Sequence, residues 1–215
     1  MIELKHVDCM AYMVTLEDNA FELAITDPPY GIAQDGHREN NRSKLAVSTN
    51  YNKALWDQSK PTEEYFRELE RVSVNQIIWG GNHLADLIGK FSPCWIVWDK
   101  LNSGNFADCE LAYTSFTTAV RKFSFAWNGM LQGDMKNKEI RIHPTQKPVQ
   151  LYKWLLKNYA KEGDRILDTH LGSGSSAIAA HYGGFDFVGC ELDEDYFKAA
   201  QKRFDAETSQ MAMEL

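Results

Sequence analysis

A buried strand stopped by two consecutive prolines constrains the fold of this chain more than any other feature. The apolar run 21–26 (Phe-Glu-Leu-Ala-Ile-Thr) leads directly into Asp27-Pro28-Pro29-Tyr30. A proline donates no ladder hydrogen bond and fixes its own φ, so the strand ends in a rigid turn that carries a carboxylate and an aromatic ring. Ligands of open α/β sheets bind just beyond such strand ends. Because Asp-Pro turns are also common without any function, a second motif is needed to choose between the two interpretations.

A second strand with a similar ending lies far along the chain. Residues 165–167 lead into Asp168, and the glycine-rich turn 171–176 opens a helix over 177–182. Glycines let a ligand approach the backbone, and a helix start offers unpaired N–H groups. The next strand, 186–190, ends at Glu191, where an acid is placed to accept hydrogen bonds from ribose hydroxyls. A plain strand–helix turn explains the glycines equally well, and alanine at position 177 weakens a nicotinamide interpretation without excluding it.

Length and composition are typical of a soluble α/β protein. The 215 residues, 44% apolar and 25% charged, predict one domain over residues 1–215 with a full-sized core. No apolar run approaches the roughly 20 residues of a membrane span, and the first residues lack a signal-peptide pattern. The cysteines are scattered without a Cys-x-x-Cys pair, which argues for a reducing compartment and against structural zinc. We therefore expect a cytoplasmic protein with no metal and no membrane contact.

Apolar runs and helical periodicities alternate along the chain, which predicts a Rossmann-like, mostly parallel sheet flanked by helices. Strand 95–98 is the most apolar and is expected at the centre of the sheet, buried on both faces. Residues 109–116 and 122–127 predict an antiparallel hairpin at one edge. The polar connection 31–60 is long enough to be a lid, a binding loop or a disordered segment. Further helices are expected over 10–16, 61–72, 82–90, 149–161 and 193–208, further strands over 2–8 and 76–79, and a loop over 128–142.

Basic residues are concentrated in one stretch, although the net charge of the chain is −7. Residues 121–157 hold eight lysines and arginines against two acids, and a smaller basic group follows the turn at Asp27–Tyr30. A charge run of this kind is either a solvated face or a contact surface for the phosphates of nucleic acid. The candidate nucleic-acid contacts are Arg38, Arg42, Lys44, Arg121, Lys122, Lys136, Lys138 and Arg141.

Three motifs together resemble one known family. The combination of 27–30, 143–148 (His-Pro-Thr-Gln-Lys-Pro) and 168–176 is similar to the DNA amino-methyltransferases that use S-adenosylmethionine. The order, with Asp-Pro-Pro-Tyr ahead of the glycine-rich motif, resembles their permuted beta group. Asp8-Cys9 matches an early motif of that group and residues 77–83 match its next strand, so the resemblance covers nearly the whole chain.

The chain departs from the family pattern in three places. Positions 168–170 are Asp-Thr-His where the family usually has Asp-Pro-Phe, and positions 175–176 are Ser-Ser where it usually has Thr-Thr. The segment 117–142, where the group carries its target-recognition region, is short. Recognition of a DNA sequence would then depend on residues 31–60 beside the active site or on a second subunit. The third alternative is that the sequence specificity is loose.

The resemblance implies an enzyme of the class I methyltransferase fold that acts on DNA. It transfers a methyl group from S-adenosylmethionine to the N6 amino group of adenine, and a homodimer is a further expectation. Cytosine-N4 methylation and a non-catalytic cofactor-binding module are the alternatives, and a nicotinamide oxidoreductase is a weaker one. An aspartate at the first position of the Asp27–Tyr30 motif favours adenine.

The catalytic candidates are Asp27, Pro28, Pro29 and Tyr30. An exocyclic amino group is a poor nucleophile because its lone pair is delocalised into the ring. The Asp27 carboxylate and the Pro28 carbonyl are placed to accept its two hydrogens, and Tyr30 offers a ring for stacking an extruded base, worth about 1–3 kcal/mol. Most of the acceleration would come from alignment of the reacting atoms.

Cofactor roles follow from the resemblance and from position. Gly172, Ser173 and Gly174 would cradle the amino-acid part, and Thr145 and Lys147 would reach its carboxylate. Glu191 would bind the ribose and Asp8 the adenine amino group. The remaining candidate cofactor contacts are Cys9, Asp27, His143, Asp168, Thr169, His170, Ser175 and Leu192.

Three residues with reactive side chains are interpreted as structural. Cys94 follows a proline, as the nucleophile of cytosine-C5 methyltransferases does, but it opens the most apolar strand and is expected in the core. His83 and His181 are expected to be surface or helix histidines rather than catalytic groups.

Overall fold

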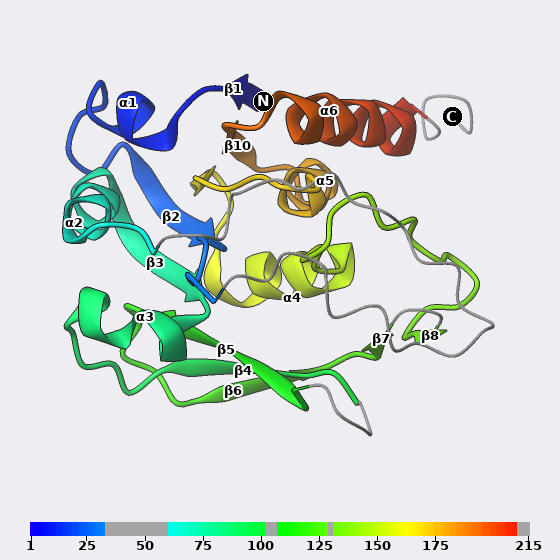
Figure 1. The fold of residues 1–215 in the computed structure, drawn as a ribbon, viewed down its shortest axis with the longest axis horizontal. Coiled ribbons are helices and arrows are strands. Elements are labelled where there is room, and N and C mark those ends of the chain that lie inside the picture. The colour runs from blue at the N-terminus through cyan, green and yellow to red at the C-terminus, as the bar shows by residue number, and fades with distance from the viewer. Residues whose placement is uncertain (33–59, 102–106, 129–130, 210–215) are drawn as a thin grey trace.

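In the computed structural model, which describes residues 1–32, 60–101, 107–128 and 131–209, one twisted sheet runs through the molecule (Figure 1). It has eight strands in the order β1-β10-β9-β2-β3-β5-β4-β6. The pairs from β1 to β3 are parallel, β5 is antiparallel to both β3 and β4, and β6 is parallel to β4. The strands are β1 (Ile2–His6), β2 (Phe21–Thr26), β3 (Ser73–Trp79), β4 (Trp95–Asp99), β5 (Cys109–Thr114), β6 (Arg121–Ser124), β9 (Arg165–Asp168) and β10 (Asp186–Glu191). The expected mostly parallel sheet is confirmed.

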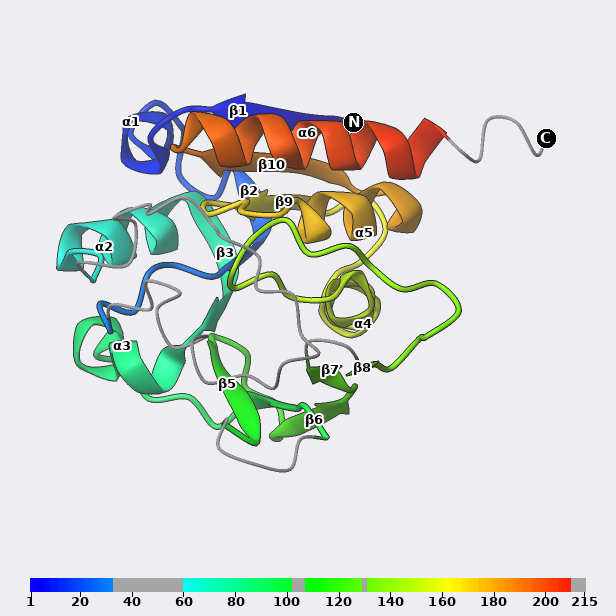
Figure 2. The ribbon, with the colours of Figure 1, turned by 45° about the vertical axis from the view of Figure 1, so that its right-hand side comes forward.

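Helices cover both faces of this sheet (Figure 2). One layer holds α1 (Cys9–Met13), α2 (Glu63–Val72) and α3 (Gly81–Ile88), and the other holds α4 (Val149–Tyr159), α5 (Ser175–Gly183) and α6 (Glu194–Ser209). The residues of β2 are divided between the two cores: Leu23 and Ile25 pack with α4, whereas Phe21 and Ala24 pack with α2. Burial on both faces explains why this strand is apolar almost throughout.

Side chains next to the helix starts cap the first two helices. An oxygen of Asp8 accepts a hydrogen bond from the Ala11 N–H at 2.9 Å and so begins α1. Thr62 caps α2 in the same way through the Tyr65 N–H at 3.3 Å. Helix α3 begins one residue before the helix expected over 82–90: Gly80, at a φ of 68°, precedes it and Asn82 lies within it. A left-handed backbone at that position suits glycine.

The expected pairing at the far edge of the sheet was wrong. Residues 109–116 and 122–127 do not form a hairpin, because β5 inserts between β3 and β4 while β6 pairs with the other side of β4. Strand β4 is therefore second from the edge, and only Ile96 and Trp98 are buried. Sequence adjacency suggested a hairpin, whereas both antiparallel partners of β5 precede it in the chain. The predicted loop 128–142 includes part of a small ribbon of β7 (Trp127–Asn128) and β8 (Leu131–Gln132).

The remaining elements agree with the sequence to within a few residues. The helices expected over 149–161 and 193–208 are α4 and α6, and the strand expected over 76–79 begins three residues earlier, at Ser73. Most of the predicted loop 31–60 lies outside the described residues. Within the part of the chain that the structure describes, every helix is too short or too polar to cross a bilayer.

Candidate active site

The carboxyl ends of β2 and β9 lie side by side, which brings the two aspartate motifs together. The two strands pair in parallel with Leu23 opposite Ile166 and Ala24 opposite Leu167. Beyond the paired residues, the hydroxyl oxygens of Thr26 and Thr169 are 2.6 Å apart. Asp27 and Asp168 each adjoin one of these threonines, so the proline turn and the glycine-rich turn open at the same end of the sheet.

A buried cluster of hydroxyls and one imidazole joins these strand ends to α2. The Tyr65 hydroxyl lies 2.7 Å from Thr169 Oγ1 and 3.1 Å from Thr26 Oγ1. His170 Nδ1 is 2.9 Å from Thr169 Oγ1 and 3.3 Å from Thr26 Oγ1. Burial lowers the pKa of His170 to about 4, so the ring is neutral at pH 7. The unusual Thr169-His170 pair therefore holds the two strand tips in register through polar contacts.

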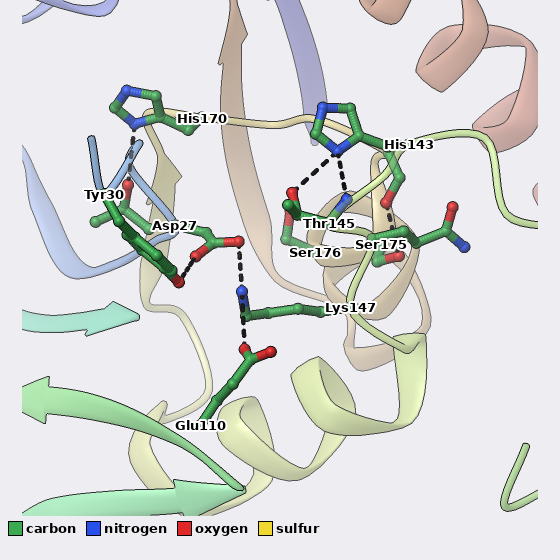
Figure 3. Close-up of polar contacts among 12 residues, drawn as sticks. Asp27, Tyr30, Glu110, His143, Thr145, Lys147, His170, Ser175 and Ser176 are labelled. Carbon is green, nitrogen blue, oxygen red and sulfur yellow. Dashed lines mark hydrogen bonds and ion pairs between the residues drawn. The ribbon is translucent and has the colours of Figure 1, made fainter. Parts of the chain in front are cut away.

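The Asp27 carboxylate is the centre of the polar contacts drawn in Figure 3. The Tyr30 hydroxyl donates a hydrogen bond to Oδ1, and the Lys147 ammonium donates one to Oδ2. Burial, and next the negative charge of Asp27, raise the pKa of Tyr30 well above its ordinary value, so this hydroxyl keeps its proton. The carboxylate is 15% exposed, whereas the Lys147 side chain is 4% exposed. Asp27 thus faces the outside and Lys147 supports it from within.

Lys147 contacts a second carboxylate, that of Glu110 on β5. Its ammonium lies 3.3 Å from Glu110 Oε2, and Lys100 forms an ion pair with Glu110 Oε1. Burial by itself lowers the pKa of Lys147, but Asp27 and Glu110 outweigh it and the pKa is raised. Lys147 therefore lies between two acids (Figure 3), and its expected contact with the carboxylate of the cofactor stays a prediction.

Tyr30 packs tightly between the start of α3 and the proline turn. A Cβ on Gly80 would lie 2.1 Å from the Tyr30 ring, so only glycine allows this approach. The exposed ring of His83 stacks on Tyr30, with centroids 5.2 Å apart and planes 18° from parallel. His83 is at the surface as expected, but it contacts a catalytic candidate, which its sequence neighbourhood did not indicate.

The glycine-rich turn lies next to β10. Glu191 at the end of β10 accepts hydrogen bonds from the Gly172 N–H at 2.8 Å and from the Asp193 N–H at 3.0 Å. Burial raises the pKa of Glu191, and these N–H groups act against that rise. A carboxylate offers about four lone-pair sites, so Glu191 keeps acceptor capacity for hydroxyls. A Cβ on Gly172 would approach only the His143 ring, at 3.9 Å, which leaves room beside the turn.

Asp168 lies beneath this turn rather than on its surface. It is 1% exposed and accepts hydrogen bonds from the Ser176 hydroxyl at 2.6 Å and the His170 N–H at 3.0 Å. Burial raises the pKa of Asp168 to about 7, which these two donors partly offset. Asp168 therefore organises the turn from inside, and its contact with the cofactor stays a prediction.

The other candidate cofactor residues fall into two groups. Asp8 and Leu192 are exposed beside the ends of β1 and β10, and the thiol of Cys9 is partly buried, with a pKa that burial raises to about 12. Thr145 Oγ1 is 3.1 Å from His143 Nδ1, and Ser173 Oγ is 3.1 Å from Ser175 Oγ. Strands β1, β10 and β9 are neighbours, so Asp8, Glu191 and the glycine-rich turn lie along one edge. Acids for hydroxyl and amino groups beside an open glycine turn suit a nucleoside-containing ligand.

A family model of N6/N4 DNA methylases matches residues 96–202. The type II methyltransferase M.HpaI of Haemophilus parainfluenzae is 25% identical over 228 residues, which cover 89% of this chain and 70% of that protein. M2.DpnII of Streptococcus pneumoniae is 24% identical, with 95% of this chain and 90% of that protein covered. The chain belongs to the N6/N4 DNA methylase family.

Solved structures share the fold of this methylase. The M1.HpyAVI–SAM complex superposes with a TM-score of 0.58 at 21% identity, over 94% of this chain and 100% of that one. The cytosine-N4-specific PvuII DNA methyltransferase gives a TM-score of 0.60 at 12% identity, over 97% of this chain and 90% of that one. The methylase therefore has the methyltransferase form of the α/β fold.

The candidate DNA contacts of the methylase are spread over separate elements. Arg121 and Lys122 are exposed on β6, where Lys122 pairs with Asp99 at 3.2 Å, and Lys136 and Lys138 are exposed in the turn after β8. Arg141 is partly buried instead, with its guanidinium 4.7 Å from the centroid of the Trp127 ring, which gives it a packing role. Arg38, Arg42 and Lys44 lie outside the described residues.

Sequence reasoning missed Glu110, Tyr65 and Arg203. Arg203 on α6 donates hydrogen bonds to the Ser173 carbonyl and the Ser175 hydroxyl, both at 2.9 Å, and to Glu139 at 2.6 Å. Each missed residue lies in a helix or strand of ordinary composition, and its partner is distant in the sequence. Cys94 is fully buried, as expected.

Proposed function

We propose that this methylase transfers a methyl group to the N6 amino group of adenine in DNA. The observation that carries the proposal is the adjacency of β2 and β9, joined at their ends by the Thr26–Thr169 contact. It puts the carboxylate of Asp27 and the glycine-rich turn at one edge of the sheet. The aspartate at position 27 favours adenine over cytosine.

The cofactor of the reaction is S-adenosylmethionine. When bound, it supplies a methyl group on a sulfonium, which is electrophilic without help from a metal or a covalent intermediate. Gly172 and Gly174 are assigned to its amino-acid part, Glu191 to its ribose hydroxyls and Asp8 to its adenine. Among the described residues, no three of the histidines, cysteines and acids are grouped as a metal site would need.

Asp27 activates the target by accepting a hydrogen bond from its amino group, with the Pro28 carbonyl as second acceptor. Tyr30 and Lys147 each use one acceptor site of the carboxylate, which has about four. Two donors from opposite sides fix the plane of the carboxylate, and a fixed acceptor contributes more than a mobile one because alignment dominates this chemistry. The stacking role of Tyr30 stays a prediction, since His83 covers one face of its ring.

The substrate is an extruded base, because an amino group inside a duplex is out of reach of a strand end. The target-recognition role of segment 117–142 and the homodimer stay predictions, as do the single domain over 1–215 and the cytoplasmic compartment. Free cysteines at positions 9, 94, 109 and 190 support a reducing compartment.

Cytosine-N4 methylation is the second candidate. The same two acceptors fit either amino group, and a cytosine-N4-specific methyltransferase shares this fold. The non-catalytic alternative predicts cofactor binding without transfer.

Nucleoside mass analysis of DNA treated with the methylase and S-adenosylmethionine tests the proposal. We expect N6-methyladenine from the wild-type chain and none from Asp27→Ala, with cofactor affinity within a few-fold of wild type. N4-methylcytosine as the product would establish the second candidate. Cofactor binding without either product would favour the non-catalytic module.

A further inference from the structure

Glu110 carries a mostly buried carboxylate that the proposed reaction does not use directly. It projects from β5 toward the Lys147 ammonium, which lies between it and Asp27 (Figure 3). Its Oε1 pairs with Lys100, while its Oε2 is buried, makes no hydrogen bond in the described part of the chain and lies 3.3 Å from the Lys147 nitrogen. Four alternating charges therefore run from Asp27 through Lys147 and Glu110 to Lys100.

We propose that Glu110 is a positioning residue for methyl transfer, which draws part of the Lys147 charge away from Asp27. The inference rests on the proposed role of Asp27 as acceptor of the target amino group. A carboxylate neutralised by one dedicated ammonium is a weak acceptor for a further N–H. A carboxylate that shares its ammonium with a second acid is oriented by it and keeps more of its negative charge.

The placement of Glu110 suits this role. Lys147 is 4% exposed, so water does not screen its attraction to either acid as it would at the surface. Glu110 is held by Lys100 and is not in contact with Asp27, so it acts through Lys147. Lys147 donates a hydrogen bond to one oxygen of the Asp27 carboxylate and Tyr30 donates one to the other, so both oxygens are held.

The ionisation of Lys147 can distinguish this positioning role of Glu110 from a role in packing alone. Burial lowers the pKa of Lys147, and Asp27 and then Glu110 raise it above its ordinary value. Loss of Glu110 removes one of the two charges that hold this proton, so Lys147 deprotonates at lower pH. The charged and titratable groups that interact with Lys147, or with its partners Asp27 and Glu110, are Lys100, Tyr30, Tyr152, His143 and Asp168.

The experiment compares steady-state methylation by the full chain and its Glu110→Gln variant between pH 6 and pH 10, with tritiated S-adenosylmethionine and duplex DNA. We expect kcat of Glu110→Gln to fall about tenfold at neutral pH while both KM values stay within about twofold. Because the Lys147 pKa is raised above its ordinary value, the wild-type kcat should stay level up to pH 10, whereas the alkaline limb of Glu110→Gln should move toward neutral pH and enter this range. Glu110→Asp, which keeps the charge, should restore the position of that limb.

Glu70→Gln is the matched control, because Glu70 also pairs with a lysine, Lys90 at 2.6 Å, and lies on α2 away from Asp27. It should leave kcat and its pH profile unchanged. Should Glu110→Gln fail to fold, Glu110→Ala, which also removes the charge, takes its place in the comparison. A wild-type kcat and an unmoved alkaline limb in a folded variant that lacks the Glu110 charge would overturn the inference. A wild-type chain that transfers no methyl group would instead refute the proposed function, so the two failures are distinct.

Discussion

At the scale of single residues, the site depends on contacts that fix side chains rather than on the identity of the reactive groups alone. Tyr30 reaches Asp27 only because Gly80 has no side chain, and the strand ends are held by hydroxyls of Thr26, Tyr65 and Thr169. Small changes at these positions displace the acceptor while the fold persists.

Gly80→Ala tests the packing of Tyr30. The left-handed backbone at φ 68° costs alanine about 1 kcal/mol, and the new Cβ would overlap the Tyr30 ring at 2.1 Å. We expect Gly80→Ala to lose most of its methylation activity. Gly89→Ala is the control, because Gly89 has a φ of 61° and open space around its Cβ, so it should lose stability only. Equal activity in the two variants, measured with thermal unfolding on the same samples, would argue against a role for the Tyr30 contact.

The variant His170→Phe, which restores the residue usual in the family, tests whether the imidazole of folded His170 is neutral. Between about pH 4 and pH 6.5 the unfolded chain binds a proton that folded His170 does not, so this residue makes the wild type less stable as pH falls. At pH 7 the variant should be less stable than the wild type, because the Thr26 and Thr169 hydroxyls lose a hydrogen-bond partner. This loss should cost about 1–3 kcal/mol of unfolding free energy. The difference in unfolding free energy between the wild type and the variant, measured by urea unfolding, should be about 2 kcal/mol smaller at pH 5 than at pH 7. Parallel stability curves would contradict the neutral ring.

At the scale of elements, one buried ion pair connects three parts of the chain. Arg203 of α6 holds the glycine-rich turn through Ser173 and Ser175, and Glu139, its acidic partner, accepts a hydrogen bond at 2.9 Å from the Val149 N–H at the start of α4. Gln132 of β8 exchanges two hydrogen bonds of 2.8 Å with the Glu139 backbone. The segment 131–142 and the candidate cofactor turn are therefore physically linked.

The variant Arg203→Met measures how much the ion pair between Arg203 and Glu139 contributes to the free energy of unfolding. The pair is 8% and 14% exposed, so removal of the cation leaves a buried carboxylate and should cost about 3–5 kcal/mol of unfolding free energy. Lys198→Met breaks the exposed pair with Glu194 on the same helix and should cost far less unfolding free energy, because water screens an exposed ion pair. Urea unfolding of both variants gives the comparison. Equal losses would mean that the Arg203 pair contributes no more than a surface pair.

At the scale of the whole molecule, charge is unevenly distributed. The chain carries a net charge of −7, yet Lys136, Lys138, Arg121 and Lys122 are exposed within one basic stretch. A protein of negative net charge binds DNA only if such a surface faces the phosphates.

DNA binding by the methylase should therefore weaken steeply with salt. Each lysine that meets a phosphate contributes about 0.9 to the slope of log affinity against log salt concentration. The double variant Lys136→Gln, Lys138→Gln should reduce the slope by about 2, whereas Lys202→Gln on α6 should leave it unchanged. Fluorescence anisotropy with a labelled duplex at several salt concentrations provides the slopes. The same slope in all three proteins would make the basic stretch a solvated surface.

The sequence alone determined the order of strands and helices, because the periodicity of apolar residues is a local property. It also determined the two strand-end motifs, since proline and glycine restrict or free the backbone wherever they stand. The proline turn, the glycine-rich turn and Glu191 were therefore found at the expected element ends.

Only the tertiary structure decided which strands pair and which charges meet. Strand β5 inserts between β3 and β4, and Lys147 is paired with Asp27 and Glu110, which are far from it in the sequence. Such contacts depend on the distance between elements after packing, and no local pattern encodes that distance. The motifs located the site, and the fold decided how its charges are shared.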